Sequence, residues 1–191
     1  MKFTLYKPNS KNTGSAFTFD STEDRNGKPT LFVSMIQQYS WDEQRKTGSF
    51  KENAKNEEKS TTVKLTDAEA GEFISSFKSR IPFVGFHKTQ DKTTVIKLTP
   101  WDKTRLIKNK DSQETYKTPA WGLTITKNSA QYFKLPIEAG EAEVLSVLLE
   151  DYIQKSLSSQ ASNYKNNPAP KKQQPKNDDS FVDDEDDDVP F

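Results

Sequence analysis

The same order of four strand-like segments and one helix-like segment occurs twice within residues 1–157. In the first half, four segments rich in β-branched and aromatic residues precede a run of apolar positions at helical spacing: 3–6, 16–19, 31–36 and 60–65, then 67–79. In the second half the corresponding segments are 83–88, 93–99, 121–126 and 132–135, then about 138–157. Two halves with one element order, about 1–80 and 81–157, indicate an internal duplication.

The two strand–helix junctions also share a tetrapeptide. Glu-Ala-Gly-Glu occurs at 69–72 and again at 138–141. Thr66 with Glu69 three residues later is typical of a capping box, which predicts the start of the first helix. We therefore expect a β-rich α+β fold of the type β4-α-β4-α, with two antiparallel sheets and two helices. The alternative is an OB-fold, which needs five strands and one helix in about 100 residues and leaves the second half unexplained.

Two polar stretches interrupt the strands. Residues 42–59 and about 103–117 are rich in charged side chains, and we expect mobile loops there that could close over a bound strand. Among the apolar and aromatic residues of the strands and helices, six are expected in the core: Phe3, Phe17, Phe73, Phe77, Leu123 and Tyr132.

Acidic and basic residues separate along the chain, although the 28 of each sign cancel. Residues 178–191 hold eight acids and no base, which leaves 20 acids against 28 bases in residues 1–177. Ser, Gln, Asn, Pro and Lys dominate 158–177, so we expect a flexible basic linker there and a disordered acidic tail over 178–191. The folded body, 1–157, has a small basic excess, which favours an anionic partner for the body and a basic partner for the tail.

The types of residue present exclude most enzyme classes. The sequence has no Cys and a single His, His87, which excludes thiol catalysis, Cys-based zinc sites and most nucleophile–base pairs. It contains no Gly-rich phosphate loop and no Gly-x-Ser-x-Gly elbow. We expect a protein that is not an enzyme and needs no cofactor or metal. Because the sequence has no apolar leader and no apolar run of about 18 residues, we expect a cytoplasmic protein without membrane contact.

Aromatic residues beside Lys and Arg suit single-stranded nucleic acid, because rings stack on bases and cations neutralise phosphates. The candidate nucleic-acid-binding residues are Tyr39, Trp41, Arg45, Lys46, Phe86, Lys88, Lys97, Trp101, Lys103, Arg105, Lys108, Trp121 and Lys127. For Trp121 two roles stay open, since a Trp at the start of a strand can also cover the edge of a core.

Two four-stranded antiparallel units, each closed by a helix, resemble the Whirly fold and its half-size relatives of the dimeric transcriptional-coactivator type. In that family two sheets pack crosswise, the helices clamp one side, and single-stranded nucleic acid lies along the exposed sheet face. The resemblance covers about residues 1–157 and rests on the element order and the internal repeat. It implies that the sheets of this chain bind single-stranded nucleic acid.

The sequence ends in Asp186, Asp187, Asp188, Val189, Pro190 and Phe191. These residues resemble the C-terminal tip of bacterial single-stranded DNA-binding proteins, Asp-Asp-Asp-Ile-Pro-Phe, with Val189 in place of Ile. The resemblance implies that the tip docks enzymes of replication, recombination and repair. Because the body does not look like the bacterial OB-fold domain, it also implies a phage-encoded single-stranded DNA-binding protein in the cytoplasm of a bacterial host.

The chemistry of the tip supports a docking role. Phe191 carries an aromatic ring and the α-carboxylate together, which suits an apolar pocket rimmed by Arg or Lys. Pro190 restricts the backbone and lowers the entropy lost on docking. The neighbouring aspartates would steer the tip toward a basic surface.

The expected function is sequence-nonspecific binding that coats and protects single-stranded DNA, with partner enzymes recruited through the tip. Two alternatives stay open: a regulator of transcription of the Whirly or coactivator type, and a protein-binding adaptor whose body never touches DNA. RNA binding also stays open, because stacking does not detect the 2′-hydroxyl. A monomer and a homodimer are both compatible with the sequence, since sheet edges can pair between two copies.

Overall fold

The computed structural model describes residues 1–89, 92–108 and 113–166. The elements of the first half are β1 (Lys2–Lys7), β2 (Ser15–Glu23), β3 (Pro29–Gln37), β4 (Ser40–Asp42), β5 (Thr47–Ser49), the short 3-10 helix η1 (Glu52–Lys55), β6 (Ser60–Leu65) and α1 (Asp67–Ser79). The elements of the second half are β7 (Phe83–Thr89), β8 (Lys92–Lys108), β9 (Gln113–Lys127), β10 (Gln131–Glu138) and α2 (Ala139–Asn166).

Each half forms one four-stranded antiparallel sheet whose strands lie side by side in chain order, followed by one helix. The first sheet has the order β1-β2-β3-β6 and the second the order β7-β8-β9-β10. The expected order of elements is therefore confirmed. The first half also contains an inserted hairpin, β4–β5, between β3 and β6.

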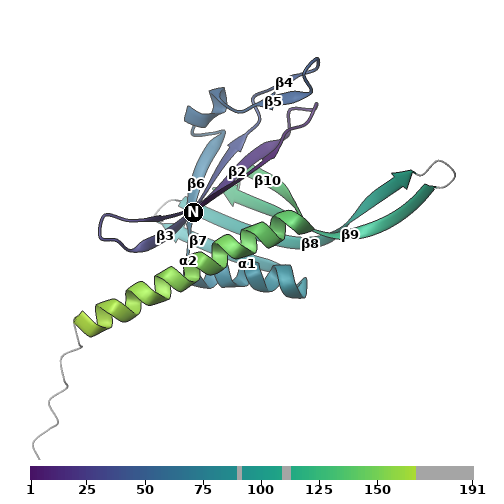
Figure 1. Cartoon of the computed structure of the whole chain (residues 1–191). Coiled ribbons are helices and arrows are strands. Elements are labelled where there is room, and N and C mark those ends of the chain that lie inside the picture. The colour runs from purple at the N-terminus through teal and green to yellow at the C-terminus, as the bar shows by residue number, and fades with distance from the viewer. Residues whose placement is uncertain (90–91, 109–112, 167–191) are drawn as a thin grey trace, which may run out of the picture.

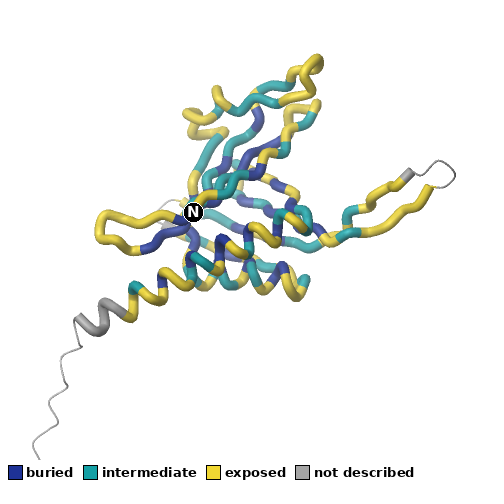
Figure 2. The backbone as a smooth tube through the Cα atoms, in the orientation of Figure 1, coloured by how far each residue is buried: buried dark blue, intermediate teal, exposed yellow. Residues whose placement is uncertain are grey.

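One hydrophobic core lies between the two sheets and the two helices (Figures 1 and 2). Alternate strand residues point into it, and α1 packs beside α2 against it. Its largest fully buried side chains include Phe17, Phe19, Leu31 and Met35 from the first sheet, Phe73 from α1, and Ile96, Leu98, Leu123 and Phe133 from the second sheet. Neither half has a core of its own, so the two halves fold as one unit.

Five of the six residues expected in the core contribute to it. Phe17, Phe73, Phe77 and Leu123 are buried, and Phe3 is partly buried against them. The expectation is wrong for Tyr132, which is exposed. In β10 the buried positions are Phe133, Leu135 and Ile137, so the pleat turns Tyr132 to the opposite face.

The expected loop at 103–117 is instead a long two-stranded ribbon. β8 and β9 pair continuously from Thr94–Lys127 to Lys108–Gln113, whereas β10 accompanies β9 only as far as the pair Glu138–Ala120. Beyond the pair Trp101–Ala120 the ribbon therefore leaves the sheet, and Figure 1 shows it reaching away from the body. We call residues 102–108 and 113–119 the arm. Its polar composition suggested a loop, but backbone pairing satisfies its amides without burial.

The expected loop at 42–59 also has regular structure. It contains β4, β5 and η1. The Asp42 carboxylate accepts hydrogen bonds from the backbone N–H groups of Gln44 and Arg45, both at 2.9 Å, which closes the hairpin turn. Short local hydrogen bonds of this kind order a polar segment that lacks apolar side chains to bury.

The second helix is longer than the sequence suggested. α2 ends at Asn166 rather than at about Leu157, so the first nine residues of the expected linker are helical. Residues 158–166 contain neither Pro nor Gly, and the first proline after the helix begins is Pro168. The side-chain amide of Gln160 also donates to the Asp67 carboxylate of α1 at 3.1 Å. The rest of the expected linker and the acidic tail lie outside the described residues.

The outer edge of β10 is closed by side chains of the first sheet. The Ser15 hydroxyl donates to the backbone carbonyl of Lys134, and the Gln37 amide donates to the carbonyl of Tyr132 at 2.9 Å. Pro136, which has no N–H, follows on the same edge strand. These contacts join the two sheets and leave the opposite face of β10 open.

Candidate nucleic-acid interface

The second sheet has one face in the core and one face toward solvent. Paired residues on neighbouring strands share a face, so the register places Phe86, Val95, Thr126 and Tyr132 in one row across β7, β8, β9 and β10. The next row is Val84, Lys97, Thr124 and Lys134. Both rows lie on the solvent side, because the intervening residues Ile96, Ile125 and Phe133 are fully buried.

Two aromatic rings stand at the ends of the first row. Phe86 is 61% exposed on β7 and Tyr132 is 53% exposed on β10. Three strand spacings separate them, which is about 14 Å at the usual distance between paired strands. Exposed rings that flank a row of short side chains suit flat, stacking ligands.

Lysines alternate with these rings. Lys88, Lys97 and Lys134 lie on the same side of the sheet and are exposed. None of the three makes an ion pair with any described residue. We call this surface the aromatic–lysine face: Val84, Phe86, Lys88, Lys97, Tyr132 and Lys134. No described carboxylate pairs with these lysines, so the described part of the chain leaves them available to an anion.

A groove follows the β10 side of this face. Two hollows of about 520 and 260 Å³ adjoin and share Thr13, Gly14, Ser15 and Lys134 in their walls. One wall is the connection between β1 and β2, and the other is β10 with the start of the arm. Tyr132 lines one end of this β10 groove, and Tyr6, Trp101 and Lys103 line the other.

Trp101 marks the root of the arm. It pairs with Ala120 on β9 and is 42% exposed, and its backbone carbonyl accepts a hydrogen bond from Arg80 at 3.2 Å. Its indole N–H has no hydrogen-bond partner among the described residues. The ring therefore lies open to the groove, and its predicted contact with nucleic acid stays a prediction.

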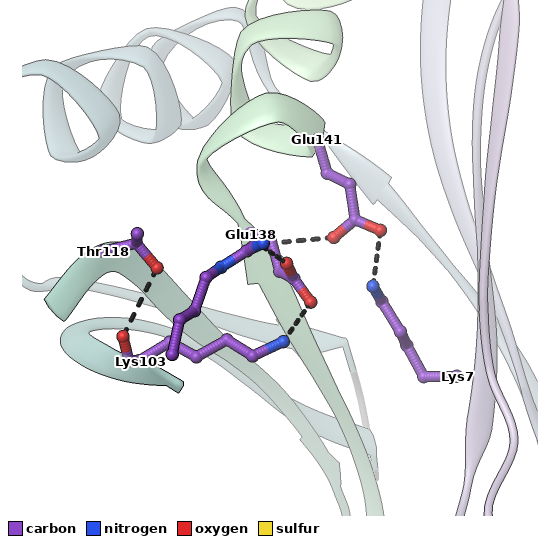
Figure 3. A network of polar contacts seen from close by, with 6 residues as sticks. Lys7, Lys103, Thr118, Glu138 and Glu141 are labelled. Atoms are coloured by element: carbon purple, nitrogen blue, oxygen red, sulfur yellow. Dashed lines mark hydrogen bonds and ion pairs between the residues drawn. The ribbon is translucent and has the colours of Figure 1, made fainter. Parts of the chain in front are cut away.

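Acidic side chains neutralise the other cations near Trp101 (Figure 3). The Glu138 carboxylate binds the Lys103 ammonium and the Arg105 guanidinium, both from the arm. Glu141 binds the Lys7 ammonium and also accepts the backbone N–H of Glu138 at 2.8 Å. The hydrogen bond from Lys103 outweighs partial burial and holds the pKa of Glu138 below its ordinary value.

The candidate residues of the β4–β5 hairpin do not lie on the aromatic–lysine face. The hairpin projects from the first sheet (Figure 1), and its cations are compensated locally. Arg45 lies 3.9 Å from Asp42, and Lys46 lies 2.6 Å from Glu43. The hydrogen bonds from Lys46 and then from Trp41 keep the pKa of Glu43 below its ordinary value. Tyr39, just before the hairpin, is exposed.

Trp121 belongs to the core, which settles its two open roles. It is 4% exposed, its indole N–H donates to the Ser76 carbonyl at 3.2 Å, and its ring meets Phe77 edge-on at 5.2 Å. The predicted contact of Trp121 with nucleic acid is therefore wrong, because Trp121 lies on the inward-facing side of β9 together with Leu123 and Ile125. Lys127 also lies on the core side of its strand, at the sheet margin, and not on the aromatic–lysine face. The side chain of Lys108 lies outside the described part of the chain.

The structure adds Tyr6, Tyr132 and Lys134, which the sequence reasoning missed. Tyr132 and Lys134 alternate with the buried Phe133 and Leu135, so the period of two along β10 contained the signal. Tyr6 lies near the end of β1, and only the packing of the two sheets brings it to Trp101 and the groove. No local pattern could have placed it there.

A third hollow of about 580 Å³ lies where β7 ends beside the first sheet and the two helices, and Asp67 and Tyr152 line it together with three lysines. Its walls include Lys28, Lys64 and Lys88, none of which has an ion-pair partner among the described residues. His87 also lines it and bonds to Glu69 of α1 at 2.5 Å. This β7-edge hollow is basic and stands at the opposite margin of the sheet from the β10 groove.

Residues 1–89, 92–108 and 113–166 contain no group of three or more His, Asp or Glu side chains suited to holding a metal. No helix within them is both long and apolar enough to cross a membrane.

No protein-family model and no curated protein matches the sequence. Among solved structures, the crystal structure of WHY1 from Arabidopsis thaliana has a TM-score of 0.53 at 13% identity, over 87% of this chain and 90% of that one. The crystal structure of WHY3 from Arabidopsis thaliana has a TM-score of 0.49 at 14% identity, over 86% of this chain and 94% of that one. The structure of the plant transcriptional regulator PBF-2 has a TM-score of 0.49 at 12% identity, over 88% of each chain. The likeness to WHY1 shows a Whirly-like fold, and the two open four-stranded sheets exclude the alternative OB-fold.

Proposed function

We propose that this chain binds single-stranded DNA without sequence preference, along the aromatic–lysine face and the β10 groove. One observation carries the proposal: exposed rings alternate on a single sheet face with lysines that pair with no described carboxylate. Single strands expose both the flat faces of their bases and a phosphate backbone, and this surface offers a partner to each. A double helix hides its base faces and would gain only the lysine contacts.

The binding mechanism is stacking combined with phosphate neutralisation. Phe86, Tyr132 and Trp101 offer rings to bases, and each stacked base contributes roughly 1–3 kcal/mol. Lys88, Lys97 and Lys134 bind phosphates and release counterions, so affinity falls with salt. The path runs from the β10 groove across the face to the β7-edge hollow. No step forms or breaks a covalent bond, so the proposed role is that of a binding protein and not an enzyme.

The acidic tip extends the proposal. Asp186, Asp187, Asp188, Val189, Pro190 and Phe191 lie outside the described residues, and their role rests on the resemblance to bacterial single-stranded DNA-binding proteins. We propose that the protein is phage-encoded, acts in the cytoplasm of a bacterial host, and recruits enzymes of replication, recombination and repair through this tip.

Titration of the full chain with oligo-dT at several salt concentrations tests the DNA-binding proposal. We expect tight binding that weakens with salt, weaker binding of duplex, and similar affinities for single strands of different sequence. The triple variant K88Q/K97Q/K134Q should lower the salt slope by roughly two, at about 0.7 per lost phosphate contact. The matched control K51Q/K55Q/K59Q removes three exposed lysines that line neither the aromatic–lysine face nor the β10 groove, and it should leave the slope unchanged. A preference for one sequence would favour the transcription regulator, and no binding would favour the adaptor.

Removal of residues 178–191 tests the role of the tail. DNA affinity should stay the same or rise, while capture of purified replication and repair enzymes is lost. A synthetic peptide of residues 183–191 should compete for that capture, and the same peptide with F191A should not. Loss of DNA binding on truncation would contradict the assignment. Sedimentation of the full chain would decide between the monomer and the homodimer.

A further inference from the structure

We infer that Glu138 and Glu141 act as built-in competitors for nucleic-acid phosphate at the Trp101 end of the β10 groove. This inference rests on the proposed function and names how that site limits its own affinity. The two carboxylates lower the affinity for DNA, whereas the lysines raise it.

The two carboxylates bind three cations that surround Trp101. Glu138 is the last residue of β10, and it holds Lys103 and Arg105, which lie two and four residues beyond Trp101 on the same face of the arm. Glu141, in the first turn of α2, holds Lys7 at the end of β1 (Figure 3). Two elements, β1 and the arm, thus bring basic side chains to this end of the groove, and Glu138 and Glu141 at the junction of β10 and α2 compensate these three cations.

The lysines of the aromatic–lysine face have no such partner among the described residues. Lys134 lines the same groove, and no described carboxylate pairs with it. Lys88 and Lys97 likewise pair with no described carboxylate. Within the described residues of the face and the β10 groove, acidic partners therefore occur at the Trp101 end.

A phosphate can replace these carboxylates. Both groups accept hydrogen bonds from Lys and Arg, and the planar Arg fork fits phosphate oxygens as well as carboxylate oxygens. The side chains of the Lys103–Glu138 and Arg105–Glu138 pairs keep between 29% and 47% of their exposure, so exchange does not require opening the core. Carboxylate and phosphate repel each other, so the two cannot share these cations without loss. A phosphate can therefore bind at Trp101 only when the Glu138 carboxylate releases Lys103 and Arg105.

The variant E138Q tests this directly, with E143Q as the matched control. Glu143 is exposed on α2 and pairs with no described cation, so its loss changes net charge equally without freeing Lys103 or Arg105. We expect E138Q to bind oligo-dT between about twofold and thirtyfold more tightly than the wild type, because two partly exposed ion pairs need no longer be broken. E143Q should change affinity less than about twofold. E141Q should show a smaller increase through Lys7 alone.

A double-mutant cycle separates competition from a general charge effect. In the background K103Q/R105Q, the gain from E138Q should vanish, and K103Q/R105Q itself should weaken binding. If E138Q equals E143Q, or if its gain persists without Lys103 and Arg105, the competition is disproved while the proposed function stands. If no variant and no wild-type protein binds oligo-dT, the proposed function itself fails. Matched melting temperatures confirm that each variant is folded.

Discussion

Glu69 and Glu141 hold equivalent positions at the starts of the two helices. Glu69 accepts the backbone N–H of Thr66, the residue before α1, at 2.9 Å, and Glu141 accepts the backbone N–H of Glu138, the residue before α2, at 2.8 Å. The two positions differ by 72 in residue number, whereas the shared tetrapeptide repeats after 69. Glu138 therefore corresponds to Thr66 and not to Glu69.

The same offset brings the buried residues of the two helices into correspondence. Phe73 matches Leu145 and Phe77 matches Leu149, and all four side chains belong to the core. The architecture is thus duplicated, but the matching Glu-Ala-Gly-Glu sequences lie three residues out of register. The position of Glu138, in place of the threonine cap of the first half, is what makes a carboxylate available to the arm.

Loss of the rings on the aromatic–lysine face should weaken binding without unfolding the protein. F86A and Y132A each remove one stacking platform, worth roughly 1–3 kcal/mol if a base lies on it. We expect a drop in oligo-dT affinity of at least about fivefold for each variant, measured by fluorescence anisotropy. Y39A is the control, because Tyr39 is 55% exposed, close to the 53% of Tyr132, but lies off this face. Equal effects of Y39A and Y132A would contradict the assigned face.

Substitution of Trp121 should affect stability and not DNA contact. W121A leaves a cavity against Phe77 and should lower the free energy of unfolding by about 3–5 kcal/mol. W121F keeps much of the ring and should cost less, with DNA affinity unchanged in the folded protein. Urea unfolding and oligo-dT titration measure the two quantities. If W121F is stable but no longer binds DNA, Trp121 takes part in DNA binding.

Neutralising the hairpin cations should have little effect on DNA binding. Arg45 and Lys46 already face Asp42 and Glu43, so a phosphate gains little there. We expect R45Q/K46Q to bind oligo-dT within about twofold of the wild type, measured at low salt, where surface charges act most strongly. A loss of tenfold or more would place the hairpin in the interface and revise the path of the strand.

The contacts of the Asp67 carboxylate with α2 should make the free energy of unfolding depend on pH in the acid range. Burial raises the pKa of this carboxyl, but hydrogen bonds from Tyr152, Ser156 and Gln160 outweigh burial and keep the pKa below its ordinary value of 3.8. The folded state therefore binds fewer protons than the unfolded state. The stabilisation is fully present above the unfolded pKa and is lost as pH falls through the lower folded pKa.

The variant D67A measures this contribution. At neutral pH it should lower the free energy of unfolding by about 1–3 kcal/mol, since the Tyr152 hydroxyl loses its acceptor at 2.6 Å. The difference from the wild type should shrink as the pH is lowered past 3.8 in urea unfolding series. E72A, an exposed change on the same helix, should show neither effect. A pH-independent difference would mean that the carboxylate charge plays no part.

The β7-edge hollow should matter only to long strands. Lys28 and Lys64 lie beyond the aromatic–lysine face, so only a strand that crosses the whole face reaches them. K28Q/K64Q should reduce affinity for oligo-dT of about 30 nucleotides and leave that for about 8 nucleotides unchanged. Equal losses at both lengths would mean that the strand begins at this hollow. No loss at either length would mean that the bound strand ends at Phe86 and does not reach this hollow.

The element order could be predicted because each buried strand alternates strongly and each helix has an apolar stripe. The first sheet can be predicted from the alternation of Phe17 and Phe19 in β2 and of the buried residues in β3. The face for which we propose DNA binding was harder to predict, because Tyr132 is an aromatic residue in a strand and composition alone favours the core. Only the phase of the alternation, set by Phe133 and Leu135, assigns it to the surface.

The prediction of loops in the two polar segments was wrong for a different physical reason. The arm and the β4–β5 hairpin bury almost no apolar surface, so hydrophobic patterning says nothing about them. Their order comes from backbone pairing between residues such as Arg105 and Tyr116, which any sequence can supply. The contact of Glu138 with Lys103 and Arg105 depends on the angle between arm and sheet, which no local pattern encodes.

Ser15 and Gln37 donate hydrogen bonds to the outward carbonyls of β10, and this affects how neighbouring copies of the protein can interact. Copies that bind next to one another on a long strand would meet at concentrations far above those in free solution, where an open sheet edge becomes a template for fibre growth. With the carbonyls of Tyr132 and Lys134 occupied and Pro136 offering no N–H, this edge presents fewer hydrogen-bonding groups to a neighbour than an uncovered edge. In the proposed coating of DNA, this edge would then be a poor place for adjacent copies to pair.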